Sequence, residues 1–311
     1  GYKGWIFTSF IVNLVQVTYY LYLQFFIYSI KIDFNLSRKF VKSTLQKSLP
    51  LIPSSFRSYI IDTSDRLILD FYNISTSNIG SYNLAYSFSN YFGQINTSST
   101  QVISPINFKL LKEKPLDAIN ILRNYFFLWM SISITIGFNL SIWVKEIYLY
   151  LYKIPNISDS YEIAGVIIMG MTTYPMLVYI NDFGIFFKKY KLIMFITLLS
   201  AVFNIVFNLI FIPYYGIYGC TIVSFLTYLL VSFSGYLIPD FKKILKQKFR
   251  AFFWILLILV LTLIQFFMID YSPYNKFCIT ILSIVFFFFY AKYTLKSLEK
   301  NEKKYSLKNI L

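Results

Sequence analysis

The chain has 311 residues, of which 57% are hydrophobic, 21% aromatic and only 14% charged. Soluble domains carry about 25% charged residues, so this composition excludes a soluble globular protein. A net charge of +15 would suggest nucleic-acid binding in a soluble protein, but here the basic residues lie between apolar runs rather than along one face. Orientation in a membrane explains this charge better, and we expect no nucleic-acid partner.

Residue types that carry common catalytic chemistry are missing or isolated. The chain has no histidine, which removes His-containing catalytic triads, His-ligated metals and imidazole proton relays. Its two cysteines, Cys220 and Cys278, lie in apolar runs without a CxxC partner, and no phosphate-binding GxxxxGK[ST] motif occurs. We expect no enzyme activity, no metal and no cofactor, with H⁺ or Na⁺ left open as a coupling ion.

Runs of roughly 20 apolar residues recur along the chain, and this length crosses the ~30 Å hydrocarbon core of a bilayer. We predict an all-α fold, a polytopic transmembrane helix bundle with about nine spans. The chain starts without Met and without a signal-peptide pattern, so we expect the later part of a longer protein. The predicted spans are residues 5–30, 49–71, 79–105, 124–145, 161–187, 192–212, 216–238, 251–269 and 275–294.

Lys and Arg are distributed unevenly around these spans. If the first span runs inward, most of the 29 Lys and Arg residues fall in cytoplasmic segments, namely 31–48, 106–123, 188–191, 239–250 and the tail from Lys292. The exceptions are Lys3, Arg57, Arg66, Lys145, Lys153 and Lys276. This asymmetry follows the positive-inside rule and predicts a multi-pass protein with a cytoplasmic C-terminus.

The most polar stretch within a span covers residues 54–66. Ionisable groups at membrane depth are costly and usually face a bundle interior or a watered cavity. Because Asp62 and Arg66 are four residues apart, they can pair on one helix face, leaving another Arg and Asp toward a central cavity. A guanidinium suits an anionic phosphate, and a carboxylate suits a coupling ion. The candidate substrate-binding residues are therefore Arg57, Arg66, Asp62 and Asp65; simple attachment of this helix to its neighbours stays open.

Asp182, Asn204 and Asn208 are candidates for ion coupling or for helix packing. Asp182, near the inner end of the fifth span, is expected to reach toward Lys188 or Lys189, with a substrate or ion role as the alternative. Asn204 and Asn208 are four residues apart in the sixth span and share one helix face. There they can hydrogen-bond to another helix, for roughly 0.6 to 2 kcal/mol each.

Two stretches resemble a known family. The first is Asp65-Arg66-Leu67-Ile68-Leu69 followed by residues 78–87 (NIGSYNLAYS), which is similar to the family's Asp-Arg, apolar pair and Val-Gly-x-Tyr-x-x-Ala-Tyr pattern. The second is residues 204–213 (NIVFNLIFIP) running into 215–220 (YGIYGC), which resembles its Asn-x-x-x-Asn, Ile-Pro-x-x-Gly-x-x-Gly-Ala stretch, with Cys220 in place of the usual Ala. The family is the O-antigen, or lipid-linked oligosaccharide, flippases of the multidrug/oligosaccharidyl-lipid/polysaccharide superfamily, and the resemblance covers residues 5–240.

The resemblance implies a two-lobed fold of fourteen helices around a central cavity, in which the nine spans match helices six to fourteen. Residues 1–48 then hold the last helix of the first lobe and a cytoplasmic linker, 49–238 the second six-helix lobe, and 239–311 a basic linker, two extra transmembrane helices and a basic tail. The implied function is alternating-access transport of a prenyl-diphosphate-linked oligosaccharide, an O-antigen or capsule repeat unit, across the bacterial cytoplasmic membrane. Implied partners are this lipid-linked oligosaccharide, membrane lipids and glycan polymerase or ligase machinery.

Three other functions stay open. A multidrug or metabolite cation antiporter of the same fold predicts a small-molecule phenotype instead of a surface-glycan one. A membrane glycan polymerase needs a sizeable external loop, whereas the predicted external segments, such as 213–216 and 270–276, are short. A scaffold within a glycan-export complex is the third.

Overall fold

The computed structural model describes residues 2–29, 37–49, 52–113, 118–151, 158–237 and 249–305, together with Pro239 and Lys242. The regular secondary structure of these residues is entirely helical, as predicted. The chain divides into two compact units, residues 1–49 and 50–311. Each unit is described by itself.

The first unit contains α1 (Tyr2–Tyr22), a π-helical turn (Leu23–Ile27) and α2 (Arg38–Ser48). Large apolar side chains of α1, such as Phe7 and Phe10, are exposed, which suits a helix in contact with lipid. Ser37 caps the start of α2, because its side-chain oxygen accepts a hydrogen bond from the Phe40 N–H (3.2 Å).

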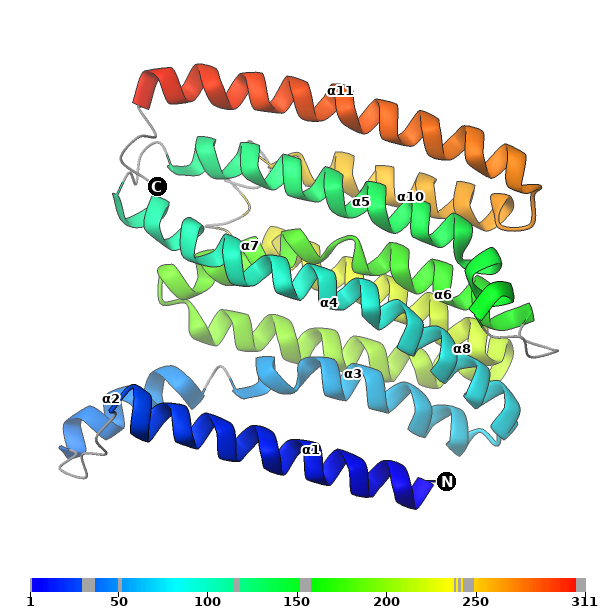
Figure 1. Cartoon of the computed structure of the whole chain (residues 1–311), viewed down its shortest axis with the longest axis horizontal. Coiled ribbons are helices and arrows are strands. Elements are labelled where there is room, and N and C mark those ends of the chain that lie inside the picture. The colour runs from blue at the N-terminus through cyan, green and yellow to red at the C-terminus, as the bar shows by residue number, and fades with distance from the viewer. Residues whose placement is uncertain are drawn as a thin grey trace. The chain divides into compact units, whose positions relative to one another are not determined.

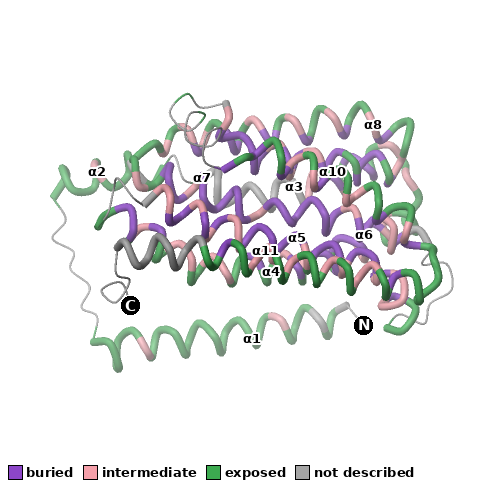
Figure 2. Tube along the Cα trace, turned by 90° about the horizontal axis from the view of Figure 1, so that it is seen from above, coloured by how far each residue is buried: buried purple, intermediate pink, exposed green. Residues whose placement is uncertain are grey.

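The second unit is a bundle of long helices whose axes run roughly parallel or antiparallel (Figure 1). The helices α6 and α7 are largely buried (Figure 2), whereas residues 273–296 of α11 are mostly exposed. The bounds are α3 (Ile52–Phe71), α4 (Thr76–Glu113), α5 (Ala118–Leu151), α6 (Ser158–Met171), α7 (Tyr174–Phe186), α8 (Tyr190–Phe233), α10 (Ala251–Met268) and α11 (Pro273–Tyr305), with a short 3₁₀ helix at Ser234–Leu237.

An aromatic cluster joins α5, α7 and α10 near one end of the bundle. The Phe126 ring meets the Tyr179 ring edge to face, with centroids 5.2 Å apart, and meets Phe249 and Trp254 at 5.1 and 6.2 Å. Edge-to-face pairs add about 0.5–1.5 kcal/mol beyond the area they bury. The cluster therefore fixes the C-terminal helices against the centre of the unit.

Six helical segments of the described chain are long and apolar enough to cross a membrane, which makes this a helical membrane-protein bundle. The expected count of nine is not reproduced by that measure, for two physical reasons. Two predicted spans are joined in one segment, because the two helical arms of α8 meet directly at Gly216, whose backbone angles are not helical (φ 53°, ψ −131°). The helices α3 and α4 are too polar to qualify. The six segments are Ile6–Ile27, Ile119–Leu151, Ser160–Phe186, Tyr190–Tyr236, Ala251–Met268 and Pro273–Lys296.

The turn within α8 explains three residues of the second motif stretch. The sequence predicts that a helix ends at Pro213 and that the chain turns at Gly216. The turn at Gly216 is confirmed, whereas the first arm of α8 continues past Pro213 to reach it. Pro213 cannot donate to the carbonyl of Leu209, and the Tyr72 hydroxyl donates to that oxygen instead (3.0 Å). Beyond the turn, a Cβ on Gly219 would lie 2.7 Å from the Phe211 carbonyl oxygen, so glycine permits the two arms to approach.

A second proline interrupts the predicted fifth span, which the structure divides into α6 and α7 at Thr172 and Thr173. Pro175 has no N–H for the carbonyl of Met171. The Asn96 amide of α4 donates to that oxygen (3.3 Å), and the Ser133 hydroxyl of α5 donates to the carbonyl of Thr172 (3.2 Å). Side chains of neighbouring helices therefore satisfy the carbonyls freed at the break, as is required within a membrane.

Candidate functional site

A buried carboxyl group connects α3, α4 and both arms of α8. Asp65 is fully buried, and its two carboxyl oxygens accept three hydrogen bonds. The Tyr82 hydroxyl donates at 2.6 Å, the Asn208 amide at 2.6 Å and the Ser224 hydroxyl at 2.8 Å. Four polar side chains from separate parts of the sequence thus meet at one point.

The asparagine pair extends this network along α8. The Asn208 amide also donates to the Asn204 side-chain oxygen (3.2 Å), which confirms that the two residues share one helix face. The same oxygen accepts from the Ser64 hydroxyl (3.0 Å), and the Asn204 amide donates to Thr227 (3.4 Å). The network consists of Ser64, Asp65, Tyr82, Asn204, Asn208, Ser224 and Thr227, and we call it the Asp65 network.

The Asp65 network holds an acid but no base. Among the described residues, no Lys or Arg forms an ion pair with Asp65. An ionised carboxylate costs several kcal/mol in such surroundings unless it is compensated, and neutral donors supply part of that compensation. The arrangement can therefore accept a proton or a small cation, which would complete the charge balance.

Arg66 follows Asp65 in the sequence, and its side chain lies beside Tyr86 of α4. It is half-buried and lies beside the ring of Tyr86, 6.0 Å from the centroid, and the hydroxyl of Tyr86 is 2.6 Å from that of Tyr228. The Nε atom of Arg66 has no hydrogen-bond partner within the described part of the chain. Arg57 and Asp62 belong to α3, but their side chains lie outside the described residues, so the expected Asp62–Arg66 pair stays a prediction.

Asp182 lies on α7 and is turned toward α4. The carboxyl group is almost completely buried and accepts hydrogen bonds from the Ser104 hydroxyl (3.0 Å) and the Asn107 amide (2.7 Å). The expected contact with Lys188 or Lys189 is not formed, because the carboxyl group faces the helix bundle rather than the membrane surface. The structure does not bring Asp182 into the Asp65 network.

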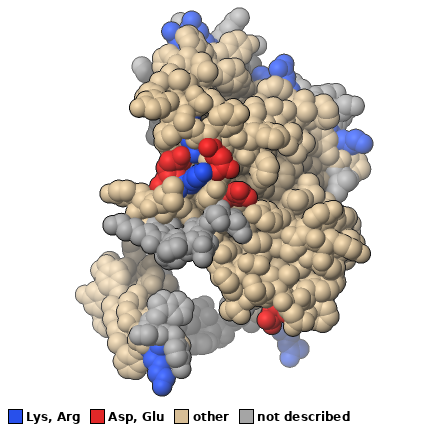
Figure 3. Space-filling view, turned by 90° about the vertical axis from the view of Figure 1, so that its right-hand side faces the viewer, with Lys and Arg blue, Asp and Glu red and all other residues tan. Residues whose placement is uncertain are grey.

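At the opposite end of the bundle, two ion pairs attach the last two helices to α5. Lys276 is fully buried, and its ammonium group donates to Glu146 and to the carbonyl of Ile269. Lys145 pairs with Asp270, and the hydrogen bond from Lys145 lowers the pKa of the Asp270 carboxyl below its ordinary value. Figure 3 shows acidic and basic atoms side by side on this mostly uncharged end. Both lysines belong to the few that break the positive-inside pattern, which is the sequence signal for these pairs.

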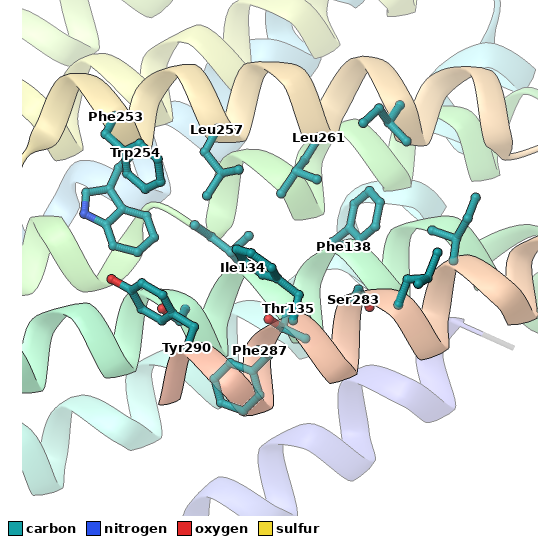
Figure 4. A pocket seen from close by; sticks show the side chains of 15 residues that line it. Ile134, Thr135, Phe138, Phe253, Trp254, Leu257, Leu261, Ser283, Phe287 and Tyr290 are labelled. Carbon is teal, nitrogen blue, oxygen red and sulfur yellow. The ribbon is translucent and has the colours of Figure 1, made fainter. Parts of the chain in front are cut away.

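A cavity of about 380 Å³ lies between α5, α10 and α11. Figure 4 shows Leu257 and Leu261 of α10 on one side of it and Phe287 of α11 on the other, with Trp254 and Tyr290 at one end. Its lining contains no charged side chain. This cavity can hold an apolar chain, but it offers nothing to an ionised group.

Sequence reasoning missed the partners of the buried acids. Tyr82 stands inside the first motif stretch, so the motif itself was the available signal. Ser224, Ser104 and Asn107 carry no comparable signal, because their pairing depends on how the helices are rotated against each other. In the described ranges, no group of three or more Cys, Asp or Glu residues could hold a metal ion.

Comparison with known proteins gives no match, whether with protein-family models, with curated proteins or with solved structures. The resemblance to lipid-linked oligosaccharide flippases therefore rests on the two motif stretches.

Proposed function

We propose that this chain is part of a flippase that moves a prenyl-diphosphate-linked oligosaccharide across a bacterial cytoplasmic membrane by alternating access. One observation carries the proposal. The polar residues of the two motif stretches that resemble the family meet in the Asp65 network, where Asn208 bonds directly to Asp65, 143 residues away in the sequence. Both motifs therefore supply side chains that satisfy one buried carboxyl group, which gives a physical reason for the two motifs to occur in the same chain.

The proposal includes nine membrane crossings. The turn between α3 and α4, the turn within α8 and the turn between α10 and α11 lie at one end of the second unit, and the turn between α7 and α8 lies at the other (Figure 1). Crossings by α3, α4 and each arm of α8 follow if their polar side chains face one another rather than lipid, as those of the Asp65 network do. The basic segments then all lie on the cytoplasmic side.

In this proposal, Asp65 couples transport to an ion gradient. Cation or proton binding at Asp65 changes what Tyr82, Asn208 and Ser224 can donate to, and these side chains lie on α4 and on both arms of α8. A change at one carboxyl group can therefore shift how three helices pack. Arg57 and Arg66 are proposed to meet the diphosphate of the substrate, because a guanidinium binds phosphate oxygens in pairs.

Complementation in cells tests this function. A strain that lacks the full-length gene receives wild type, Asp65→Asn, Arg66→Ala or the exposed control Asp70→Asn, with membrane levels of each protein measured. We expect wild type and Asp70→Asn to restore surface glycan, and the other two variants to leave lipid-linked glycan on the inner leaflet. Normal surface glycan in the deletion strain, with altered sensitivity to toxic cations, would reject the flippase and favour the cation antiporter.

A further inference from the structure

The short helix α2 of the first unit presents an exposed apolar side. At about 100° per residue, its large apolar side chains fall on one half of the circumference, namely Phe40, Val41, Leu45 and, directly after the helix, Leu49. Phe40, Leu45 and Leu49 are 59%, 52% and 61% exposed, and Figure 2 shows most of α2 as exposed. A contiguous group of exposed apolar side chains on a helix indicates contact with a membrane or with another protein.

The charged residues of α2 distinguish between these two partners. Its sequence, RKFVKSTLQKS, contains four Lys or Arg residues and no Asp or Glu. Arg38 and Lys42 lie beside the apolar side chains, since they line one surface hollow together with Leu45. Long basic side chains can rest their aliphatic parts on apolar surface and keep their charged ends at its polar edge. This combination fits a surface in which negative charge lies directly above an apolar interior.

The place of α2 in the chain brings it to such a surface. The preceding segment, Ile6–Ile27, is long and apolar enough to cross a membrane, and only residues 28–37 separate it from α2. With 11 residues, α2 is ~16 Å long, about half of the ~30 Å hydrocarbon thickness, so it cannot itself cross. A helix that is too short to cross, but is attached to one that does, can lie along the membrane surface.

We infer that α2 binds the cytoplasmic leaflet, with its apolar side chains among the acyl chains and Arg38, Lys39 and Lys42 at the headgroups of anionic phospholipids. Buried apolar area and attraction to anionic lipid act together in such a helix. The cytoplasmic side follows from the excess of Lys and Arg on that side of the membrane. This lipid contact does not depend on which substrate the protein moves.

Site-directed spin labelling of the full chain tests the contact. In a chain that carries Cys220→Ser and Cys278→Ser, a nitroxide is attached at Leu45→Cys on the apolar side or at Ser43→Cys, which lies about 200° away around the helix. The protein is reconstituted in nanodiscs of phosphatidylcholine, alone or with about one-third phosphatidylglycerol. Relaxation of the label by oxygen, which partitions into lipid, is compared with relaxation by a water-soluble nickel chelate.

With phosphatidylglycerol present, we expect the label at position 45 to respond mainly to oxygen and the label at position 43 mainly to nickel. Each basic residue near an anionic surface favours the bound state about fivefold. The triple variant Arg38→Gln, Lys39→Gln and Lys42→Gln should therefore lower the ratio of docked to undocked α2 about a hundredfold.

A matched control removes the same charge from other parts of the chain. Lys242, Lys292 and Lys296 are exposed, and the triple variant Lys242→Gln, Lys292→Gln and Lys296→Gln should leave the response of both labels as it is without these changes.

Three results would overturn the inference. If the label at position 45 responds to nickel as strongly as the label at position 43, the apolar side faces water. If its response to oxygen is the same without phosphatidylglycerol or in the Arg38, Lys39 and Lys42 variant, charge contributes nothing to the contact. If it is shielded from both reagents, another segment or a second copy of the chain covers this side. Glycan transport does not enter the measurement, so failure here is distinguishable from failure of complementation.

Discussion

At the end of the bundle where α5 meets α11, two lysines occupy similar ion pairs with different burial. Lys276 is completely buried against Glu146, whereas Lys145 and Asp270 keep 28% and 58% of their side chains exposed. Solvent screens an exposed pair and competes for its hydrogen bonds, while a buried ammonium group depends on its protein partners. The two pairs should therefore contribute unequally to stability.

Replacing Lys276 by Met leaves Glu146 without its cation and frees the carbonyl of Ile269. We expect Lys276→Met to lower the free energy of unfolding by about 1–3 kcal/mol. The matched variant Lys145→Met should cost only about 0–1 kcal/mol, because its pair is exposed. Denaturant unfolding in detergent micelles measures both, and equal costs would show that burial does not distinguish the two pairs.

The exposed pair also predicts a pH dependence. The pKa of Asp270 is lowered from its ordinary value of 3.8, first by the hydrogen bond from Lys145, so the stability it contributes is fully present above pH 3.8 and is lost as the pH falls through the lowered pKa. We expect Asp270→Asn to be less stable than wild type at neutral pH by about 0.2–1 kcal/mol, a surface-pair value. This difference should vanish in acid. A difference that persists in strong acid would assign the effect to something other than ionisation.

Polar side chains largely determine which helices pack together, because apolar helix surfaces pack against lipid as readily as against each other. Asn139 and Trp143 of α5 donate to Ser283 and Thr280 of α11 at 2.9 and 2.8 Å. The broken span follows the same rule, since Asn96 and Ser133 reach the carbonyls next to Pro175. Specific hydrogen bonds thus fix helices that hydrophobicity alone leaves free to slide.

The break at Pro175 can be tested by a double-mutant cycle. Asn96→Leu should destabilise the protein by about 1–3 kcal/mol, because the carbonyl of Met171 loses its donor. In a Pro175→Ala background the residue-175 N–H can serve that carbonyl, so the same substitution should cost less, with a coupling of about 0.5–3 kcal/mol. Strict additivity of the two changes would show that Asn96 does not compensate for the proline.

For the whole molecule, hydropathy and charge predicted where the chain forms helices. A run of about twenty apolar residues in a bilayer has to hydrogen-bond its own backbone groups, and a helix does this. The predicted spans 251–269 and 275–294 coincide with α10 and most of α11. The sequence also placed Asn204 and Asn208 on one face, since a four-residue spacing requires it. It failed at Pro213, where Tyr72 lets α8 continue, and at Asp182, which turns inward. Both failures arise from contacts between helices, which spacing along one helix cannot reveal.

The proposed nine crossings can be tested by labelling. In a chain with Cys220 and Cys278 replaced by serine, single cysteines are placed at Asn73, Tyr214 or Ser272 and, for the other side, at Lys188. A membrane-impermeant thiol reagent added to intact cells should label the first three and not the fourth. Failure at Tyr214 alone would indicate that α8 does not reverse at the outer surface, and the span count would fall.

A transport measurement in inverted membrane vesicles tests directly whether the Asp65 network supports glycan translocation. Vesicles with wild type, Asp65→Asn or Asp70→Asn receive lipid-linked oligosaccharide on the outer leaflet and an imposed Na⁺ or proton gradient, and the fraction that becomes protected from an added glycosidase is followed over time. We expect protection with wild type and Asp70→Asn and a large loss with Asp65→Asn. Equal protection with all three, or none above vesicles without the protein, would contradict this expectation.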